Sequence, residues 1–514
     1  MAVQLFGAID VGSYEIGLTI SECSKKNGIR EIDHVSHRIN LGTDTFRTGK
    51  ISYEHVRELK ALLSEYRRIM DSYGVKEYRA YGTSAIREMV NSTVVLDGIE
   101  LLTGIHIDVL SNSEQRFLDY KSIAARGEGF TRFIEKPTAI VDIGGSSIQI
   151  SLFDKDRLVE TQNLKLGVLR LYDQIHSIDA GTRRLDYVIG ELVNSQLKVF
   201  QNLYLGDQRI RNIIVVDDYI SPILQNRTLT GRDPGYIDCA TFRAVMERVR
   251  TMNAQEVAKR FGMADDNVPL LYVSGKMLEC IVDAFGSEMI WAPGVTLCDG
   301  MVYEFAEKKG YKLPDHDFEA DILSIAHNTA ERYHGIPERQ HELEEIAVKI
   351  FDATKRYHGL GERERLLLRI AAILHDCGKY ISMVNVGKCS YDIIMATEII
   401  GLSHIEREII ANVVKFNHET FIYYRAQQSA TDLDRQSYLT IAKLTAILRL
   451  ANGLDRSHEQ KFHDIRVEVC DGQLIIRVPG EVDLTMEKGL FVHRADFFEE
   501  VYGIRPVIRQ TKRK

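Results

Sequence analysis

Short apolar runs that break at glycine-containing turns occur twice in the first third of the chain. Residues 4–23 predict a β-hairpin, in which "LFGAID" and "IGLTISEC" flank a turn at Gly12-Ser13. Residues 139–153 predict a second hairpin, in which "AIVDI" and "IQISLF" flank a Gly-Gly-Ser-Ser turn. Helical and strand patterns follow each hairpin, so the chain is expected to contain a duplicated α/β domain pair.

The segments between the hairpins show both periodicities. Residues 52–74 carry apolar side chains at helical spacing. The stretch "KEYRAYGTSAIRE" predicts a strand, a turn at Gly82 and the start of a helix. "IHIDVL" predicts another strand, after which Ser113 is expected to cap a helix that opens at Glu114.

The pattern changes to nearly continuous helix after residue 316 and to strands after residue 460. "IRVEVCDGQLIIRV" reads as two alternating runs around Asp471-Gly472, which is a hairpin signal. We therefore expect an α/β pair at 1–130 and 131–312, an all-α domain at 313–460, and a small α+β segment at 461–514.

Composition narrows the class of protein. The chain has 514 residues, 45% hydrophobic and 27% charged, with a net charge of −8, and is expected to be a soluble globular protein of about three or four domains. No long apolar run or signal peptide is evident, and the seven cysteines are scattered without a C-x-x-C pair. These features predict a cytoplasmic protein that binds neither membranes nor nucleic acid.

The two turns are suited to phosphate binding. Glycines let successive backbone N–H groups point into one concavity, and serine hydroxyls add donors. The carboxylates before the turns, Asp10 and Asp142, suit a hydrated Mg²⁺ that phosphates also hold. One such turn is most often only structural, but two copies that open the halves of a duplicated unit favour a ligand site between them. The expected phosphate-binding residues are Gly12, Ser13, Gly144, Gly145, Ser146 and Ser147.

Five stretches then carry a resemblance to a known family. "AIDVGS", "GTSAIRE", "LSNSEQ", "IVDIGGSS" and "LKLGVLRL" occur in this order over residues 7 to 171, and "AAILHDCGKYIS" and "ILRLANGLDRSH" follow in the helical region. Together they resemble the exopolyphosphatase / guanosine pentaphosphate phosphohydrolase (Ppx/GppA) family. The resemblance implies a duplicated actin-like domain pair of the ribonuclease H-like (ASKHA) class, followed by an HD-like helical domain.

The resemblance also implies an activity and its residues. The expected reaction is Mg²⁺-dependent hydrolysis of the terminal phosphoanhydride of inorganic polyphosphate, or of a (p)ppGpp-type substrate, by a homodimer. Glu114 occupies the position of the family's catalytic glutamate, and Arg87 occupies the position of the family's arginine near the scissile phosphate. Lys165 and Arg170 are expected along the polyphosphate path.

Several positions depart from the family pattern. Tyr14 stands where the family usually has Asn, and Gln149 stands where it has a Glu that holds metal. Gln has a carbonyl acceptor but no charge. A third Gly-rich turn is replaced by "IIVVDDYI", which offers Asp217 or Asp218 instead. A non-catalytic sensor of polyphosphate or alarmone is therefore the alternative to an enzyme.

The helical domain resembles an HD phosphohydrolase domain. His341 and the His375-Asp376 pair fall at three expected metal-ligand positions, and His418 lies in a suitable place. The closing Asp is replaced by Asn452, with Asp455 three residues later. The alternatives are a second metal site and a degenerate scaffold that helps to hold polyphosphate.

Overall fold

The computed structural model describes residues 3–177, 185–226, 235–314, 316–424, 433–454, 459–480 and 482–511. The chain divides into two compact units, Met1–Asp317 and Phe318–Lys514. We call them the N-terminal and the C-terminal unit.

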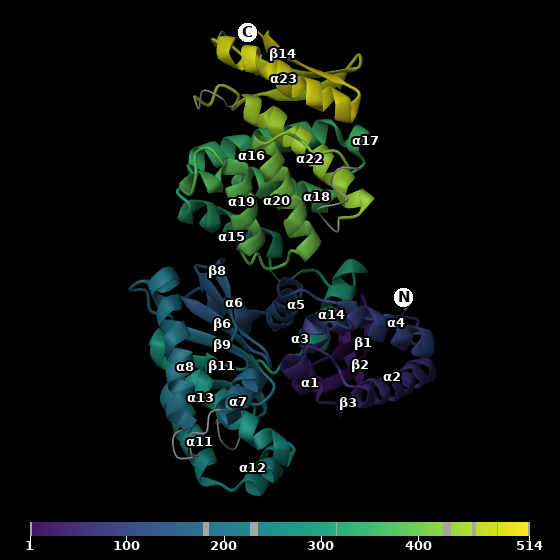
Figure 1. The fold of residues 1–514 in the computed structure, drawn as a ribbon, viewed down its shortest axis with the longest axis vertical. Helices are drawn as coiled ribbons and strands as arrows, with labels where there is room; N and C mark the ends of the chain where they lie inside the picture. Colours follow the sequence, from purple (N-terminus) through teal and green to yellow (C-terminus); the bar gives the residue numbers. More distant parts are fainter. Residues whose placement is uncertain are drawn as a thin grey trace. The chain divides into compact units, whose positions relative to one another are not determined.

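The N-terminal unit begins with a five-stranded sheet in the order β3-β2-β1-β4-β5, which with its helices forms the first lobe (Figure 1). β1 and β2 form the predicted antiparallel hairpin, and β1 pairs in parallel with β4. The strands are β1 (Gln4–Val11), β2 (Glu15–Ser24), β3 (Gly28–Arg38), β4 (Glu77–Gly82) and β5 (Asp108–Val109). Its helices are α1 (Leu41–Thr48), α2 (Tyr53–Tyr73), α3 (Ser84–Glu88), α4 (Ser92–Thr103) and α5 (Asn112–Ala124). The next helix, α6 (Glu128–Ile134), lies with the second lobe, where the Phe133 ring is 5.6 Å from that of Tyr236 and 5.5 Å from that of Trp291.

The second lobe is built on a six-stranded sheet in the order β10-β11-β9-β6-β7-β8. β6 and β7 form the second predicted hairpin, and β6 pairs in parallel with β9. The strands are β6 (Thr138–Ile143), β7 (Ile148–Asp154), β8 (Arg157–Leu164), β9 (Asn212–Asp217), β10 (Tyr236–Asp238) and β11 (Met289–Trp291). The helices are α7 (Val168–Ser177), α8 (Leu185–Phe200), η2 (Gln201–Leu205), α9 (Ser221–Leu224), α11 (Cys239–Thr251), α12 (Ala254–Phe261), η3 (Asp265–Asn267) and α13 (Val268–Phe285). Each lobe thus has an antiparallel hairpin followed by a parallel strand, which confirms the duplication.

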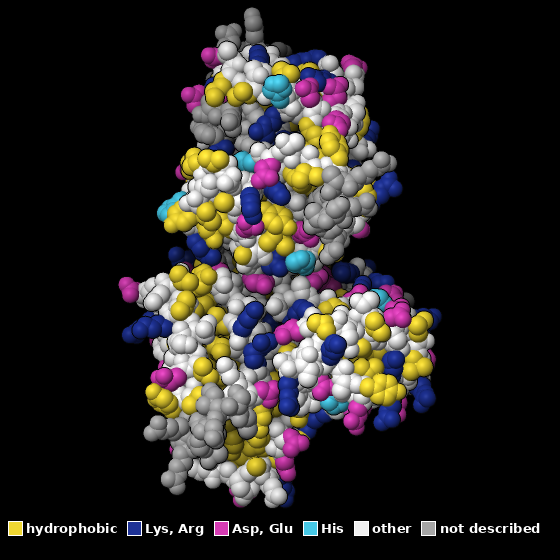
Figure 2. Space-filling view, viewed as in Figure 1, with side chains coloured by type: hydrophobic (Ala, Val, Ile, Leu, Met, Phe, Trp, Pro, Cys, Tyr) yellow, Lys and Arg dark blue, Asp and Glu magenta, His cyan; other side chains and the backbone are white. Residues whose placement is uncertain are grey.

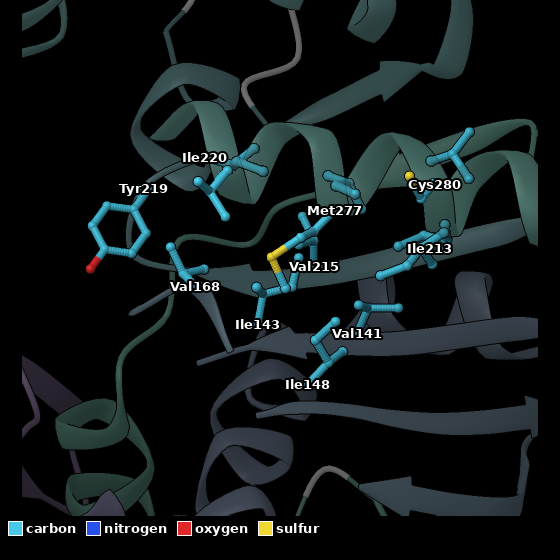
Figure 3. Packing of buried hydrophobic residues seen from close by; sticks show 14 of the residues in the cluster. Val141, Ile143, Ile148, Val168, Ile213, Val215, Tyr219, Ile220, Met277 and Cys280 are labelled. Carbon is cyan, nitrogen blue, oxygen red and sulfur yellow. The ribbon is translucent and has the colours of Figure 1, made fainter. Parts of the chain in front are cut away.

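The core of the second lobe forms where α13 packs on this sheet. Figure 3 shows Met277 of α13 above Val141 and Ile143 of β6 and Val215 of β9. All four side chains are buried. Alternate residues of the strands point toward the helix, as the period-2 pattern requires. This packing fixes the end of β6, from which the second turn departs.

Helix α14 (Leu297–Lys308) returns to the first lobe. Phe305 of α14 stacks on Phe6 of β1 with ring centroids 4.1 Å apart. Leu297, Met301 and Val302 belong to the same buried cluster. The segment expected within the second domain, 131–312, therefore ends with a helix that packs on the first sheet.

The C-terminal unit contains the helices expected at 313–460 together with the expected α+β segment. Its hairpin turns at Asp471 and Gly472, whose φ angles of 51° and 72° suit the two-residue turn that the sequence predicted. The strands are β12 (Arg466–Cys470), β13 (Gln473–Pro479) and β14 (Arg505–Thr511). The helices are α15 (Phe318–Arg332), α16 (Pro337–Ala353), α17 (Lys355–His358), α18 (Glu362–Ile373), η4 (Cys377–Tyr380), α19 (Val386–Ala396), α20 (His404–His418), α22 (Arg435–Leu454) and α23 (Thr485–Tyr502).

The charge on the surface is mixed. On the face drawn in Figure 2, Lys and Arg side chains alternate with Asp and Glu side chains. Among the described residues, no helix has both the length and the apolar character needed to cross a membrane.

Candidate active site

A cavity of about 280 Å³ in the N-terminal unit collects residues from both lobes. It lies where β1, β6 and β9 end, since Gly12, Gly144 and Asp218 follow these strands directly and all line the cavity. Ligands of open α/β sheets bind at the carboxyl ends of parallel strands. The expected residues Asp10, Gly12, Ser13, Asp142, Gly144, Gly145 and Ser146 all line it.

The second turn lines the cavity and has two backbone N–H groups on the side away from α7. The N–H groups of Val168 and Leu169 donate to the carbonyls of Gly144 and Gly145, each at 3.0 Å. Since a trans peptide carries its N–H opposite its C=O, the N–H groups of Gly145 and Ser146 point away from α7. Neither N–H has a partner among the described residues.

Gly167 holds this second turn in place. A Cβ at Gly167 would lie 2.2 Å from the Gly145 carbonyl oxygen, so only glycine permits the close approach of α7 to the turn.

The first turn is built in the same way. Gly42 N–H donates to the Ser13 carbonyl at 2.6 Å, which directs the Tyr14 N–H to the opposite side. A Cβ at Gly12 would lie 2.5 Å from the Glu15 carbonyl oxygen, so glycine is required here too. The Ser13 hydroxyl shares a 2.7 Å hydrogen bond with Ser84. The cavity therefore receives one donor-rich turn from each lobe.

Carboxylates surround these turns. The acidic residues that line the cavity are Asp10, Glu15, Asp119, Asp142, Asp217 and Asp218. Burial raises the pKa of Asp10 to about 8, with contributions from the charges of Asp218 and Glu15. Burial and the neighbouring Asp217 raise the pKa of Asp218 to about 7, although its side chain is exposed to the cavity. The protein by itself therefore disfavours the ionised forms of Asp10 and Asp218, which a bound cation would stabilise.

The donor set fits a hydrated Mg²⁺. Asp10 Oδ1 is buried and has no hydrogen-bond partner among the described residues. No three His, Cys, Asp or Glu side chains in the described ranges form a metal cage. Mg²⁺ is commonly held by one or two carboxylates with water and substrate phosphates, so this arrangement suits it better than a tightly ligated ion.

Asp217 replaces the third Gly-rich turn. Its carboxylate accepts hydrogen bonds from the N–H groups of Tyr219 (2.7 Å) and Ile220 and from the Ser274 hydroxyl (2.5 Å). A side chain therefore closes this turn and ties it to α13. Asp218, the next residue, is left facing the cavity.

Glu114 and Arg87 do not line the cavity. Helix α5 opens at Asn112 with Ser111 as its cap, which corrects the expected cap at Ser113. The Glu114 carboxylate accepts from the Ser111 N–H and hydroxyl, at 3.0 and 2.7 Å. Arg87 Nη1 donates to the Leu110 carbonyl at 2.7 Å. Gln115, adjacent to Glu114, is the side chain that reaches the cavity.

The remaining expected phosphate ligands lie beside the cavity. Arg170 Nε donates to the Ser146 carbonyl at 3.2 Å, and its Nη2 pairs with Glu88 of the first lobe at 2.9 Å. Ser147 is buried behind the turn, and Lys165 is exposed. Gln149 is buried and donates to Thr161, so it also stands back from the cavity. These residues support the turn or lie outside it.

The cavity residues that the sequence did not identify include Arg116, Asp119 and Asn267. Arg116 and Asp119 are three residues apart and therefore lie on one face of α5. That spacing could have indicated from the sequence that Arg116 and Asp119 act together. Asn267 lies at the start of α13, and no sequence pattern marked it as a cavity residue.

The expected metal ligands of the C-terminal unit that the structure describes do not form a cluster of three. His341 is 67% exposed at its side chain and pairs with Glu345, whereas His375 is completely buried. His375 Nδ1–H donates to the Ala372 carbonyl at 2.8 Å, and its Nε2, 3.5 Å from Asp376 Oδ2, has no hydrogen-bond partner among the described residues. His418 donates to the His375 carbonyl at 2.7 Å rather than facing a metal. Asp455 lies outside the described residues.

Two basic side chains form ion pairs with Asp376 and neutralise its charge. Arg339 Nη1 lies 3.1 Å and Lys379 Nζ 3.0 Å from its carboxylate. Arg339 also donates to Asn452, at 3.4 Å. Burial opposes ionisation of Asp376, but His375, Lys379 and Arg339 together keep its pKa below the ordinary value. The described residues do not fit a divalent metal, and we derive no step through one here.

Comparison with known proteins agrees with this architecture. The Ppx/GppA phosphatase family model matches residues 20–309, and the model of Ppx/GppA phosphatase domain III matches residues 324–490. A guanosine-5'-triphosphate,3'-diphosphate pyrophosphatase of Photobacterium profundum is 20% identical over 505 residues, 92% of this chain and 92% of that protein. Exopolyphosphatase 1 of Mycobacterium tuberculosis is 23% identical over 339 residues, 63% of this chain and 92% of that protein.

Solved structures show the same fold. An exopolyphosphatase from Cytophaga hutchinsonii has a TM-score of 0.51 at 18% identity and covers 59% of this chain and 98% of its own. The Ppx/GppA family member of Aquifex aeolicus has a TM-score of 0.50 at 18% identity, covering 60% of this chain and 100% of its own. The fold is the actin-like fold of these proteins. Since the first family model alone spans more than half of the residues, the chain belongs to the Ppx/GppA phosphatase family.

Proposed function

We propose that the N-terminal unit is a Mg²⁺-dependent exopolyphosphatase that removes the terminal phosphate of inorganic polyphosphate. One observation carries the proposal: two turns, one from each lobe, line a single cavity and carry backbone N–H groups that have no partner among the described residues. Two such concavities suit consecutive phosphate groups of a chain. Mg²⁺ held by Asp10 would neutralise phosphate oxygens and balance the surrounding carboxylates.

The residues of the chain then have separate tasks. The N–H groups of Gly145 and Ser146 bind the terminal phosphate, and the Tyr14 N–H with the Ser13 hydroxyl binds the next one. These fixed donors stabilise the charge that develops as the phosphoanhydride breaks. Asp218 faces the cavity and takes the proton of the attacking water, since a carboxylate with a pKa of about 7 is an effective base at neutral pH.

Glycine variants test the proposal because they alter the turns without removing a charge. Gly12→Ala and Gly167→Ala introduce a Cβ against turn backbone, and we expect each to reduce orthophosphate release from polyphosphate at least about tenfold. Gly190→Ala is the matched control, since a Cβ at Gly190 meets nothing within 4 Å. Equal release by all three variants would contradict the assignment of the turns. Tight binding without release by the wild type would replace the hydrolase with a polyphosphate or alarmone sensor.

Guanosine pentaphosphate is a second candidate substrate, favoured by Asn267. This side chain is 9% exposed and lines the cavity, and its Oδ1 has no hydrogen-bond partner among the described residues. An amide oxygen accepts hydrogen bonds only from N–H or O–H groups, which a nucleoside offers at its base and ribose and which the internal phosphates of a polyphosphate chain lack. Tyr14 and Tyr219 line the same cavity.

A substrate comparison separates the two candidates. If the nucleoside is bound, Asn267→Ala lowers kcat/KM for guanosine pentaphosphate by roughly five- to tenfold, the value of one hydrogen bond, and leaves kcat/KM for polyphosphate unchanged. Equal changes for both substrates would remove Asn267 from nucleoside recognition.

A further inference from the structure

Arg116 is the side chain of the cavity that the proposed reaction has not yet used. It lies in the first turns of α5, is 7% exposed, and lines the cavity. Of the described residues that line this space, Arg116 is the only Lys or Arg among six carboxylates. A permanent positive charge in this position would attract an anionic ligand.

The guanidinium has a defined position. Its Nη1 donates to Asp142 Oδ2 and lies 3.8 Å from Asp119 Oδ2. Its Nη2 lies over Gly144, because a Cβ built at Gly144 would be 3.2 Å from Nη2. Gly144 begins the second turn, whose residues Gly144, Gly145 and Ser146 line the cavity. The cation and the donor-rich turn are therefore adjacent.

The guanidinium also has hydrogen-bonding capacity to spare. It carries five N–H donors, and the Nε donor is buried without a partner among the described residues. Leaving a buried charged donor unpaired costs more free energy than leaving a neutral one. A phosphate group on the Gly145–Ser146 turn offers several charged oxygens to such a group.

We propose that Arg116 binds the phosphate group seated on the Gly144–Ser146 turn, and that Asp142 positions Arg116 instead of holding Mg²⁺. The inference rests on the proposed function, since it needs a phosphate chain in the cavity. It assigns the two aspartates that precede the turns to different tasks: Asp10 faces the cation, and Asp142 orients the arginine. The sequence-based expectation gave both to Mg²⁺.

Binding of inorganic tripolyphosphate, measured by calorimetry with and without Mg²⁺, tests this inference independently of turnover. We expect Arg116→Gln to weaken binding at least about tenfold in both conditions, as for loss of a charge-assisted hydrogen bond. Arg116→Lys keeps the positive charge but loses the paired N–H donors of the guanidinium, so its affinity for tripolyphosphate should lie between those of the wild type and Arg116→Gln. Arg126→Gln is the matched control, because Arg126 is exposed, follows α5 and does not line the cavity.

Asp142→Asn separates positioning from metal binding. If Asp142 positions Arg116, the variant weakens tripolyphosphate binding but leaves the Mg²⁺ concentration for half-maximal binding unchanged. A tenfold rise in that concentration would show instead that Asp142 holds the metal and would overturn the inference.

The double variant Arg116→Gln, Asp142→Asn removes both buried charges together and serves if the single variants fail to fold. Double-variant affinity equal to that of the wild type would also overturn the inference. Wild-type binding without phosphate release would contradict the hydrolase and leave the Arg116 assignment intact. Wild-type protein that binds no tripolyphosphate would contradict both.

Discussion

The carboxylate of Glu114 is hydrogen-bonded to Ser111, whose hydroxyl in turn accepts from the Glu114 N–H at 3.2 Å. The two residues form a capping box at the start of α5. The box satisfies two backbone N–H groups at this helix end, those of Ser111 and Glu114. The same contacts occupy the carboxylate that the family resemblance assigned to catalysis.

Glu114→Gln should therefore act on stability more than on turnover. We expect a loss of about 0.5–1 kcal/mol in the free energy of unfolding, because the box loses a charged acceptor beside the helix N-terminus. Phosphate release should stay within about threefold of the wild type. Thermal unfolding and release assays on Glu114→Gln and Ser111→Ala, which breaks the same box, provide the check. A hundredfold loss of kcat in Glu114→Gln with unchanged stability would restore its catalytic role.

Asp218→Asn, unlike Glu114→Gln, should act on turnover more than on stability. As the proposed proton acceptor, Asp218 should contribute at least about a hundredfold to kcat with little effect on KM. Its pKa is raised to about 7, so the acid form predominates below that pH and the wild-type rate should rise as pH increases toward 7. The variant should lose this acid limb. A pH–rate profile of identical shape in Asp218→Asn would assign the base elsewhere.

Arg170 connects the two lobes at the second turn through Glu88 and the Ser146 carbonyl. Arg170→Ala should raise the Kd for tripolyphosphate about three- to tenfold, since the turn loses a support and not a ligand. Glu88→Ala should have a smaller effect, because half-exposed ion pairs contribute little. Lys165→Ala is the control, because Lys165 is exposed and does not line the cavity, and it should leave the Kd unchanged. An effect of Lys165→Ala as large as that of Arg170→Ala would favour the polyphosphate path predicted from the sequence.

The C-terminal unit should be sensitive to acid rather than to chelators. Burial lowers the pKa of His375 to about 4 from its ordinary 6.5. The unfolded chain therefore binds more protons than the folded one between these values, and the contribution of His375 to stability is lost as pH falls from 6.5 toward 4. His375→Gln should flatten the pH dependence of unfolding in that window. An unchanged slope would contradict the buried neutral histidine.

Metal analysis of the same unit is a separate test. Because Arg339 and Lys379 neutralise Asp376, we expect no metal that is lost on Asp376→Ala. One equivalent of metal in the wild type that disappears in this variant would establish the second metal site.

The sequence was informative wherever one local pattern determines the structure. The hairpins around Gly12 and around Gly144 follow from alternating apolar residues and obligatory glycines, and both were predicted correctly. The cavity itself was inferred from the duplication. A cytoplasmic location and a homodimer stay predictions.

The site residues that were not predicted correctly depend on the directions in which neighbouring side chains point. Glu114 and Gln115 are adjacent in sequence, yet only Gln115 reaches the cavity, because Ser111 instead of Ser113 caps α5. The local signal for this cap was present, because Ser111 and Glu114 stand at the S-x-x-E spacing of a capping box. By contrast, Arg339 could not be predicted as the partner of Asp376, because the two are 37 residues apart and are brought together only by folding.

Orthophosphate release from long-chain polyphosphate, with Mg²⁺ and with excess chelator, tests the central claim most directly. The wild type should release phosphate with Mg²⁺ and lose at least about a hundredfold of that rate without it. Asp10→Asn should require a higher Mg²⁺ concentration for the same rate, since Asp10 holds the unpartnered carboxylate oxygen of the cavity. Release that is absent under all conditions, or equal with and without Mg²⁺, would contradict the assignment of this cavity as a Mg²⁺-dependent phosphohydrolase site.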